Sequence, residues 1–269
     1  MPIYQQKIKR TTDPHKTLKT KIQCIMNKST QQNKFFIVNS ASILLAILIL
    51  FVSCIIVSKS NQVVATSSED SPKIGYTIVL DPGHGGLDPG SIGRVSKVKE
   101  AELNLKIATL LANKFTKIGI SIVLTRTNEN GLYGLYSNNY KKRDMAKRKE
   151  IIENTKPNMV LSVHMNSFTN TKLRGAQVFY DKSSEISRSL AVSIQQFFTS
   201  DLPASDKGVS IGDYFMLKCT DAPSVICECG FLSNAEDEKL LLTKSYQEKV
   251  ADCIYKGVVA FLNLPSLPS

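Results

Sequence analysis

The sequence predicts an α/β domain over residues 75–269, with a mixed, largely parallel sheet of about six strands and helices on both faces. Short apolar runs that end at turns alternate with longer segments whose apolar residues recur at helical spacing. Strands and helices that alternate in this way form open sheets covered by helices on both sides. A third observation is that the first 74 residues differ in composition, and it predicts an N-terminal transmembrane helix before the domain.

The N-terminal part divides into three segments. Residues 1–34 hold seven Lys, one Arg and one Asp, so they carry +7 of the formal net charge of +11. Residues 35–58 contain no charged residue, and these 24 residues exceed the roughly 20 that span a bilayer as a helix. A buried core helix of this length would usually show a polar stripe, so we expect a transmembrane signal anchor. Residues 59–74 are polar, without periodicity, and are expected to be a linker.

The orientation of the anchor follows from its flanks. The positive-inside rule makes residues 1–34 a basic cytoplasmic leader and places the domain outside the cytoplasm. A cleaved signal peptide, with Val63 and Ala65 before the cut, is one alternative, and a lipoprotein signal at Cys54 is another. The leader is long for a signal peptide and apolar residues continue past Cys54, so we favour a retained anchor. Because the leader holds most of the charge, the basic composition does not indicate nucleic-acid binding.

The first half of the domain begins with the apolar run YTIVLD (76–81), a strand that stops at the turn DPGHGG. Residues 100–118 carry leucine and isoleucine at helical spacing and predict a helix. SIVLTR (121–126) predicts the second strand. A polar loop rich in Gly and Asn follows, and residues 141–155 predict a strongly charged helix.

The second half continues the alternation. NMVLSVH (158–164) and GAQVFYD (175–181) predict two further strands, and a helix is expected over 184–200. YFMLK (214–218) and SVICECG (224–230) predict the last two strands, before a closing helix over 244–263.

Four of the six cysteines fall in the domain: Cys219, Cys227, Cys229 and Cys253. Disulfides are chemically possible outside the cytoplasm, although a domain of this size does not need them. Cys227 and Cys229 alternate on one face of an apolar run, and their spacing does not match a zinc knuckle. We expect them to be buried core thiols.

The candidate chemistry lies at strand ends. His84 and His164 each follow a strand-like run directly, and Glu228 ends the run SVIC. If these strands are parallel neighbours, all three side chains leave the sheet at one edge. Two imidazoles and a carboxylate form a common catalytic zinc set, and a further carboxylate is needed to move a proton, a role that suits Glu228. Each residue also has a structural alternative. The histidines would only form hydrogen bonds that hold the fold, and Glu228 would be a partner in a buried salt bridge. Glu100, which begins the predicted helix, would only be a favourable charge in its first turn.

Four motifs in order then point to a family. TIVLDPGHGGLDPGSIG, KEAELNL, LSVHMNS and ICECGFLSNAEDEKLL resemble the successive signatures of zinc-dependent N-acetylmuramoyl-L-alanine amidases of the AmiC/CwlV type, over about residues 76–263. The resemblance implies Zn²⁺ bound by His84, Glu100 and His164, with Glu228 as the catalytic residue. Glu102 is the rival to Glu100, but it faces elsewhere on the helix. Cysteines on both sides of Glu228 depart from the family pattern, and residues 128–142 have no clear match.

A finer resemblance indicates one branch of the family. The anchor, AQVFYDKSSEISRSLAVSIQQFF and YQEKVADCIYKGVVAFL resemble the CwlD-type germination-specific amidases of spore-forming bacteria. This implies that the enzyme removes peptides from muramic acid in spore cortex, in the space between the forespore membranes. It also implies two partners, an accessory lipoprotein and a downstream deacetylase that completes muramic-δ-lactam.

The sequence therefore predicts hydrolysis of the amide between N-acetylmuramic acid and L-alanine in peptidoglycan. Two other functions stay open. One is a zinc peptidase that acts on soluble peptides, and the other is a non-catalytic wall-binding or amidase-regulating protein.

Overall fold

A computed structural model describes residues 47–48, 75–134 and 138–264. The predicted leader (1–34) and linker (59–74), and all of the predicted anchor (35–58) except Ile47 and Leu48, lie outside the described residues. Within the described ranges, no helix has both the length and the hydrophobicity that a bilayer span requires.

The sheet has six strands in the order β2-β1-β3-β6-β4-β5. Each neighbouring pair is parallel except β4 and β6, which are antiparallel. The carboxyl ends of β1, β3 and β6 therefore meet at one edge, as predicted, although His164 and Glu228 lie inside β3 and β6 rather than beyond their ends. The strands are β1 (Thr77–Pro82), β2 (Ser121–Leu124), β3 (Met159–Asn166), β4 (Gln177–Tyr180), β5 (Ser210–Ile211) and β6 (Ser224–Phe231).

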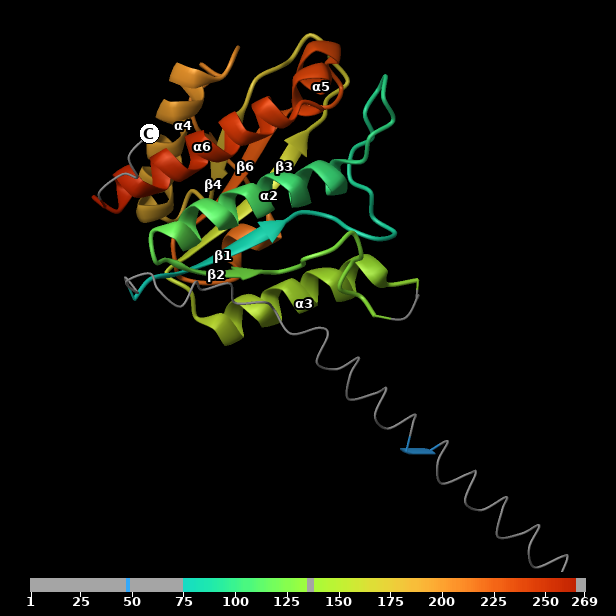
Figure 1. The fold of residues 1–269 in the computed structure, drawn as a ribbon, viewed down its shortest axis with the longest axis vertical. Helices are drawn as coiled ribbons and strands as arrows, with labels where there is room; N and C mark the ends of the chain where they lie inside the picture. The colour runs from blue at the N-terminus through green and yellow to red at the C-terminus, as the bar shows by residue number, and fades with distance from the viewer. Residues whose placement is uncertain (1–46, 49–74, 135–137, 265–269) are drawn as a thin grey trace, which may run out of the picture. The chain divides into compact units, whose positions relative to one another are not determined.

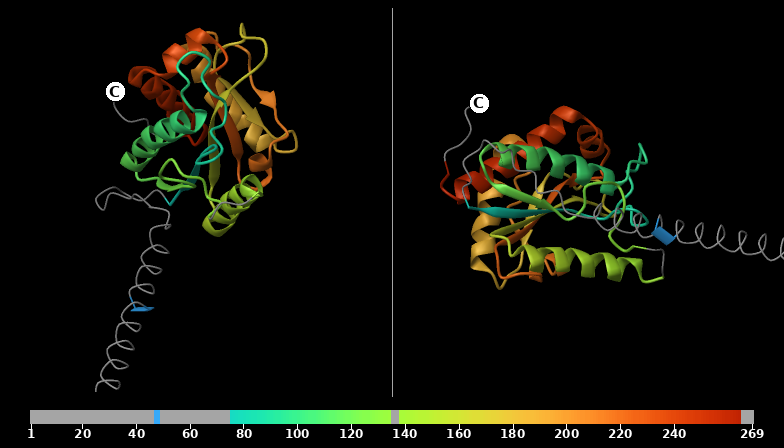
Figure 2. Two further views of the ribbon diagram at one scale, coloured as in Figure 1. Left: turned by 90° about the vertical axis from the view of Figure 1, so that its right-hand side faces the viewer. Right: turned by 60° about the horizontal axis from the view of Figure 1, so that its bottom comes forward.

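Helices cover both faces of the sheet, which confirms the predicted architecture (Figures 1 and 2). Three long helices lie on one face: α2 (Glu100–Lys117), α4 (Glu185–Asp201) and α6 (Lys244–Phe261). Helix α3 (Tyr140–Thr155) and the 3₁₀ helix η1 (Phe215–Lys218) lie on the other. The short helix α5 (Ala235–Leu241), which we did not predict, follows β6.

Strand alternation divides the apolar side chains between two cores of unequal size. Ile78 and Leu80 of β1 point into the large core beneath α2, α4 and α6. Val79, between them, belongs to a small cluster on the α3 face with Ile152 and Met216. Because that second cluster is small, much of the space between α3 and the sheet is left to polar side chains and a cavity.

One predicted strand is wrong. Residues 214–218 form the 3₁₀ helix η1 instead. The sheet still has six strands, because β5, which we did not predict, completes it. Both edges of β6 are already paired, with β3 and β4, so the sheet offers no place for a strand there. Met216 and Leu217 are consecutive and both buried. Their burial does not distinguish a strand from a 3₁₀ turn, because every residue of the doubly covered strand β6 is buried as well.

The cysteine prediction is confirmed within the described domain. Cys219, Cys227, Cys229 and Cys253 are all buried free thiols. Cys227 and Cys229 belong to the large core, on the opposite side of β6 from the cavity described below.

Candidate metal centre

His84 follows the end of β1, in a turn that holds it in an unusual backbone conformation. Its φ is 61°, in the left-handed region that non-glycine residues rarely adopt. The residue before it has to be glycine, because a Cβ at Gly83 would lie 2.1 Å from Cε1 of His164. The turn thus brings the two imidazoles together, with ring centroids 5.0 Å apart.

Glu100 is the first residue of α2, and its carboxylate lies between the two histidines. Oε1 is 3.2 Å from Nε2 of His84 and 3.0 Å from Nδ1 of His164. One ligand atom from each of the three residues lies within 4.8 Å of the other two. Glu102, the rival carboxylate, is not part of this group. The structure therefore brings together the three residues that the sequence named as zinc ligands.

Further groups hold the trio in place. Asp88 Oδ2 lies 2.9 Å from Nδ1 of His84, so that carboxylate orients the ring and leaves Nε2 directed at the centre. The backbone N–H groups of Ser91 and Met165 donate to Glu100 at 2.8 Å and 3.1 Å. The Asn104 side chain donates to Glu100 Oε1 at 3.3 Å. Fixed ligands of this kind are typical of metal centres.

The electrostatics favour positive charge at the centre of the trio. Burial lowers the pKa of His84, but the adjacent carboxylates of Asp88 and Glu100 outweigh burial and raise it to about 9. Burial raises the pKa of Glu100, but His164 and His84 outweigh this and hold it far below its usual range. A cation among these groups would balance the same negative charge.

Two buried arginines, which the sequence analysis missed, hold the backbone that carries His84. Arg126 Nε and Arg148 Nη1 both donate to the carbonyl of Pro82, at 2.9 Å and 2.8 Å. Arg126 also donates to the Gly83 carbonyl at 2.8 Å, and Arg148 to the His84 carbonyl at 2.6 Å. Three consecutive carbonyls are thereby satisfied by two guanidinium groups.

Arg148 is itself held by two carboxylates. It contacts Asp81 Oδ1 at 2.5 Å and Asp144 Oδ2 at 2.6 Å. The Ser162 and Thr125 hydroxyls also donate to Asp81, at 2.5 Å and 2.6 Å. The sequence contained one signal for this network, since Asp144 and Arg148 are four residues apart on a strongly charged helix. Nothing in the sequence, however, placed them against β1.

Glu228 lies beside the trio on the neighbouring strand. It is the register partner of His164 across the β3–β6 pair, so the two side chains leave the same face of the sheet. Its side chain is buried, and Oε2 has no hydrogen-bond partner among the described residues. Burial is the main cause that raises its pKa to about 7, with Glu100 adding to this and the two histidines opposing it. A carboxyl with such a pKa can both accept and donate a proton near neutral pH.

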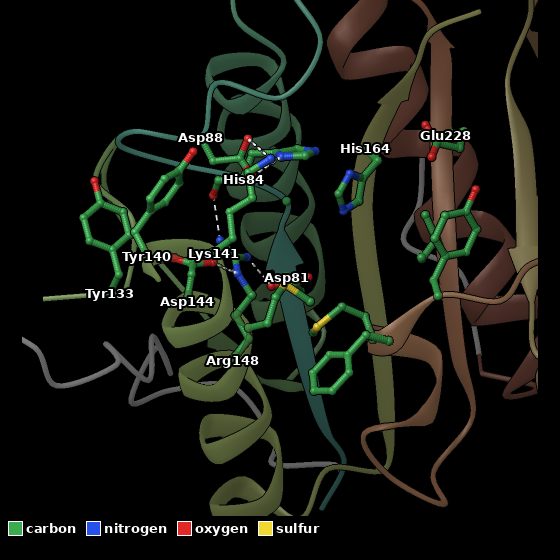
Figure 3. A pocket seen from close by; sticks show the side chains of 16 residues that line it. Asp81, His84, Asp88, Tyr133, Tyr140, Lys141, Asp144, Arg148, His164 and Glu228 are labelled. Atoms are coloured by element: carbon green, nitrogen blue, oxygen red, sulfur yellow. Dashed lines mark hydrogen bonds and ion pairs between the residues drawn. The ribbon is translucent and has the colours of Figure 1, made fainter. Parts of the chain in front are cut away.

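A cavity of about 190 Å³ opens beside these residues, between α3 and η1. His84, His164 and Glu228 line one part of it (Figure 3). One wall comes from Tyr133, Tyr140 and Lys141 and the opposite wall from Tyr214, Phe215 and Met216. The arrangement can hold a substrate carbonyl near a metal while an unpaired carboxyl faces the same space.

Comparisons with known proteins agree with this geometry. Residues 78–260 match the family model described as N-acetylmuramoyl-L-alanine amidase. The germination-specific N-acetylmuramoyl-L-alanine amidase of Bacillus subtilis is 30% identical over 194 residues, which are 71% of this chain and 81% of that protein. The N-acetylmuramoyl-L-alanine amidase LytC of B. subtilis is 31% identical over 193 residues, but the match spans only 36% of LytC.

A solved structure shows the same fold at higher identity. The CwlD amidase from Clostridioides difficile, solved in complex with the GerS lipoprotein, is 36% identical, with a TM-score of 0.67. The match covers 70% of this chain and 98% of that one. The family model alone spans well over half of this sequence. The chain therefore belongs to the N-acetylmuramoyl-L-alanine amidase family.

Proposed function

We propose that this protein hydrolyses the amide bond between the lactyl group of N-acetylmuramic acid and L-alanine in peptidoglycan. One observation carries the proposal: the buried carboxyl of Glu228, unpaired among the described residues, faces the same cavity as His84 and His164 of the trio, in a chain of this family. His84, Glu100 and His164 would bind Zn²⁺. Their donors, two imidazoles and a carboxylate, are a common catalytic zinc set, and their convergence fits the ion.

Zinc in such a site lowers the pKa of a bound water to near 7 and polarises a carbonyl. The chain's own residues supply the rest. Asp88 and the hydrogen bonds to Glu100 keep the ligands oriented, so little reorganisation is needed when substrate binds. Apolar residues that line the cavity, such as Met216 and Ile226, limit the access of bulk water to the reacting bond.

Glu228 moves the proton. Its carboxylate takes a proton from the attacking water as the new C–O bond forms at the lactyl carbonyl carbon. It then passes that proton to the leaving nitrogen as the C–N bond breaks. The products are a lactyl carboxylate and the α-ammonium group of L-alanine, which takes up the second proton of the water, so one water is consumed. A pKa near 7 suits a group that performs both transfers.

We also propose a biological setting. Similarity to a germination-specific amidase supports action on spore cortex, as a step towards the muramic-δ-lactam on which germination depends. The apolar, charge-free segment 35–58 supports membrane anchoring with the catalytic domain outside the cytoplasm, between the forespore membranes. The solved complex of the C. difficile relative with a lipoprotein supports an accessory lipoprotein as partner here. A muramic acid deacetylase would act on the product.

Digestion of purified peptidoglycan tests the reaction. We expect the protein to release peptides that begin with a free L-alanine amine and to leave the glycan strands intact, as mass spectrometry would show. Removal of metal with a chelator should abolish release, and added Zn²⁺ should restore it. Cleavage between amino acids within the peptide would indicate a peptidase instead. Full activity after metal removal would exclude the zinc mechanism, and no cleavage by the zinc-loaded protein would favour a non-catalytic role.

A further inference from the structure

The inward face of α3 carries three charged residues besides the apolar Met145 and Ile152, and two of these charges pair with each other. Lys141, Asp144 and Arg148 lie on the same side of the helix and line the cavity. Asp144 and Arg148 pair with each other, and Arg148 also pairs with Asp81. Lys141, one turn nearer the helix start, is not part of that network.

Lys141 is the cation of this cavity that can still take a ligand. Its side chain is 65% exposed, and its one ion pair among the described residues is with Asp88, Nζ to Oδ1, at 3.5 Å. That contact is longer than an ordinary N–H···O hydrogen bond, and an ammonium group has three donors. Arg148, the other cation that lines the cavity, is 2% exposed and already contacts two carboxylates.

The cavity wall that carries Lys141 is hydrogen-bonded to the loop that follows the metal ligand His84. The Tyr133 hydroxyl accepts a hydrogen bond from the backbone N–H of Leu87 at 2.9 Å. The rings of Tyr133 and Tyr140 pack edge to face, with centroids 5.7 Å apart. Tyr140 directly precedes Lys141 in the chain. Lys141 therefore extends from a wall that is held at a defined place beside His84 (Figure 3).

Lys141 lies close to the metal ligands, because Asp88 contacts both Lys141 and His84. The carboxylate is 3.5 Å from Lys141 Nζ and 2.9 Å from His84 Nδ1. A substrate group bound by Lys141 is therefore expected to lie near the cleaved bond, and an extended peptide advances only roughly 3.3–3.6 Å per residue. In peptidoglycan, the D-glutamate after L-alanine continues the chain through its side-chain carboxyl. Its α-carboxyl therefore projects from the chain, either free and anionic or amidated and neutral.

We propose that Lys141 binds the free α-carboxylate of the residue that follows L-alanine, and so makes the protein prefer non-amidated peptidoglycan. This rests on the proposed amidase function. The opposite wall of the cavity favours the same direction for the peptide, because Tyr214, Phe215 and Met216 carry no charge that could attract this carboxylate. Lys141 is thus a specificity-determining residue, which acts on the leaving peptide and not on the cleaved bond.

The test compares two substrates that differ only at this group. Zinc-loaded protein is given glycan-linked muropeptides with the peptide L-Ala-γ-D-Glu-L-Lys or L-Ala-γ-D-isoGln-L-Lys, in which the γ-carboxyl is bonded to lysine in both, and kcat/KM is measured for each. We expect a preference of roughly 10-fold for the free acid, the size of one partly exposed charge-assisted contact. Lys141→Gln should remove the preference, and Lys141→Arg should keep most of it. Lys142→Gln is the matched control, because Lys142 is exposed and does not line the cavity. It should leave the ratio unchanged.

The ratio separates recognition from a structural effect. Loss of the contact between Lys141 and Asp88 could disturb His84, but that would lower kcat/KM equally for both substrates. An equal rate on both substrates in the unmodified protein would overturn the Lys141 assignment and leave the amidase function standing. A preference for the free acid that is undiminished in Lys141→Gln would also overturn the Lys141 assignment and leave the amidase function standing. Cleavage of neither substrate would overturn both.

Discussion

Glu100 and Glu228 are both buried carboxylates beside the same pair of histidines, yet their surroundings are opposite. Their exposures are similar, 2% and 8%, so burial alone does not distinguish them. Glu100 accepts from two backbone N–H groups and contacts both imidazoles. Glu228 has an oxygen with no partner. The pKa of Glu100 accordingly falls far below its usual range, while that of Glu228 rises to about 7.

This difference assigns the two roles. A carboxylate that stays ionised at every physiological pH is suited to bind a cation, whereas one that titrates near neutrality is suited to move protons. The contrast extends to the backbone around them. The turn that carries His84 is fixed by Arg126, Arg148 and Asp88, whereas Glu228 is held by its strand alone. The turn with the metal ligand His84 is thus held by several hydrogen bonds, whereas the carboxyl of Glu228, which transfers the proton, keeps an oxygen without a partner among the described residues.

The largest effect should come from Glu100→Gln, because the amide removes the ionised ligand at the centre of the trio. Zinc affinity should fall by more than the roughly 100-fold that loss of a supporting residue can cause, and activity should fall with it. Equilibrium dialysis against Zn²⁺ would measure the affinity. Glu102→Gln is the matched control two residues away and should bind zinc normally. Equal losses in both variants would refute the choice of Glu100.

Glu228→Gln should separate catalysis from metal binding. We expect kcat to fall by roughly 10²–10⁴, the usual contribution of acid–base catalysis. Zinc content, measured by atomic emission, should stay at the level of the unmodified protein. The melting temperature should hold or rise, since an amide is less costly to bury without a partner than a carboxylate. Loss of zinc in this variant would contradict the division of roles.

Arg148→Met should test the arginine network that holds the turn with His84. The change leaves Asp81 and Asp144 without their buried counter-ion, so the free energy of unfolding should fall by about 3–5 kcal/mol. Urea denaturation would measure it. Lys147→Met is the neighbouring control, because in the described part of the chain Lys147 forms only an exposed pair with Glu150. Its effect should stay within about 0.5 kcal/mol. Similar stabilities for the two variants would mean that the arginine network contributes little.

The smallest effect is expected in acid. Burial would raise the pKa of Asp81, but Arg148, Ser162 and Thr125 lower it from 3.8 to about 2. The ionised Asp81 carboxylate therefore contributes its full stabilisation at pH values above 3.8, its ordinary pKa. This stabilisation is lost as the pH falls towards about 2, its pKa in the folded protein. A shift of this size corresponds to roughly 2 kcal/mol. Asp81→Asn should lack this part of the pH dependence in urea denaturation between pH 5 and 2. An identical slope in both proteins would exclude the assignment.

Much of the fold follows from local patterns. Apolar runs such as YTIVLD and NMVLSVH could be identified as strands because buried parallel strands are apolar throughout. The helices over 100–117 and 185–201 begin and end close to the predicted residues. YFMLK was misjudged, because a short apolar run is compatible with a strand or a 3₁₀ turn. Only the pairing of β6 on both edges decides between them.

The sequence by itself determined the candidate chemistry: two histidines after apolar runs, an acidic residue in a late strand, and ordered motifs that added Glu100. The tertiary structure alone decided their proximity, since residues 100, 164 and 228 come from three separate elements and residue 84 comes from the turn after β1. It alone revealed Arg126, Arg148 and Lys141 as parts of the site. The physical reason is that these long side chains act on groups 40 to 70 residues away in sequence or across a cavity, and no local pattern encodes such contacts.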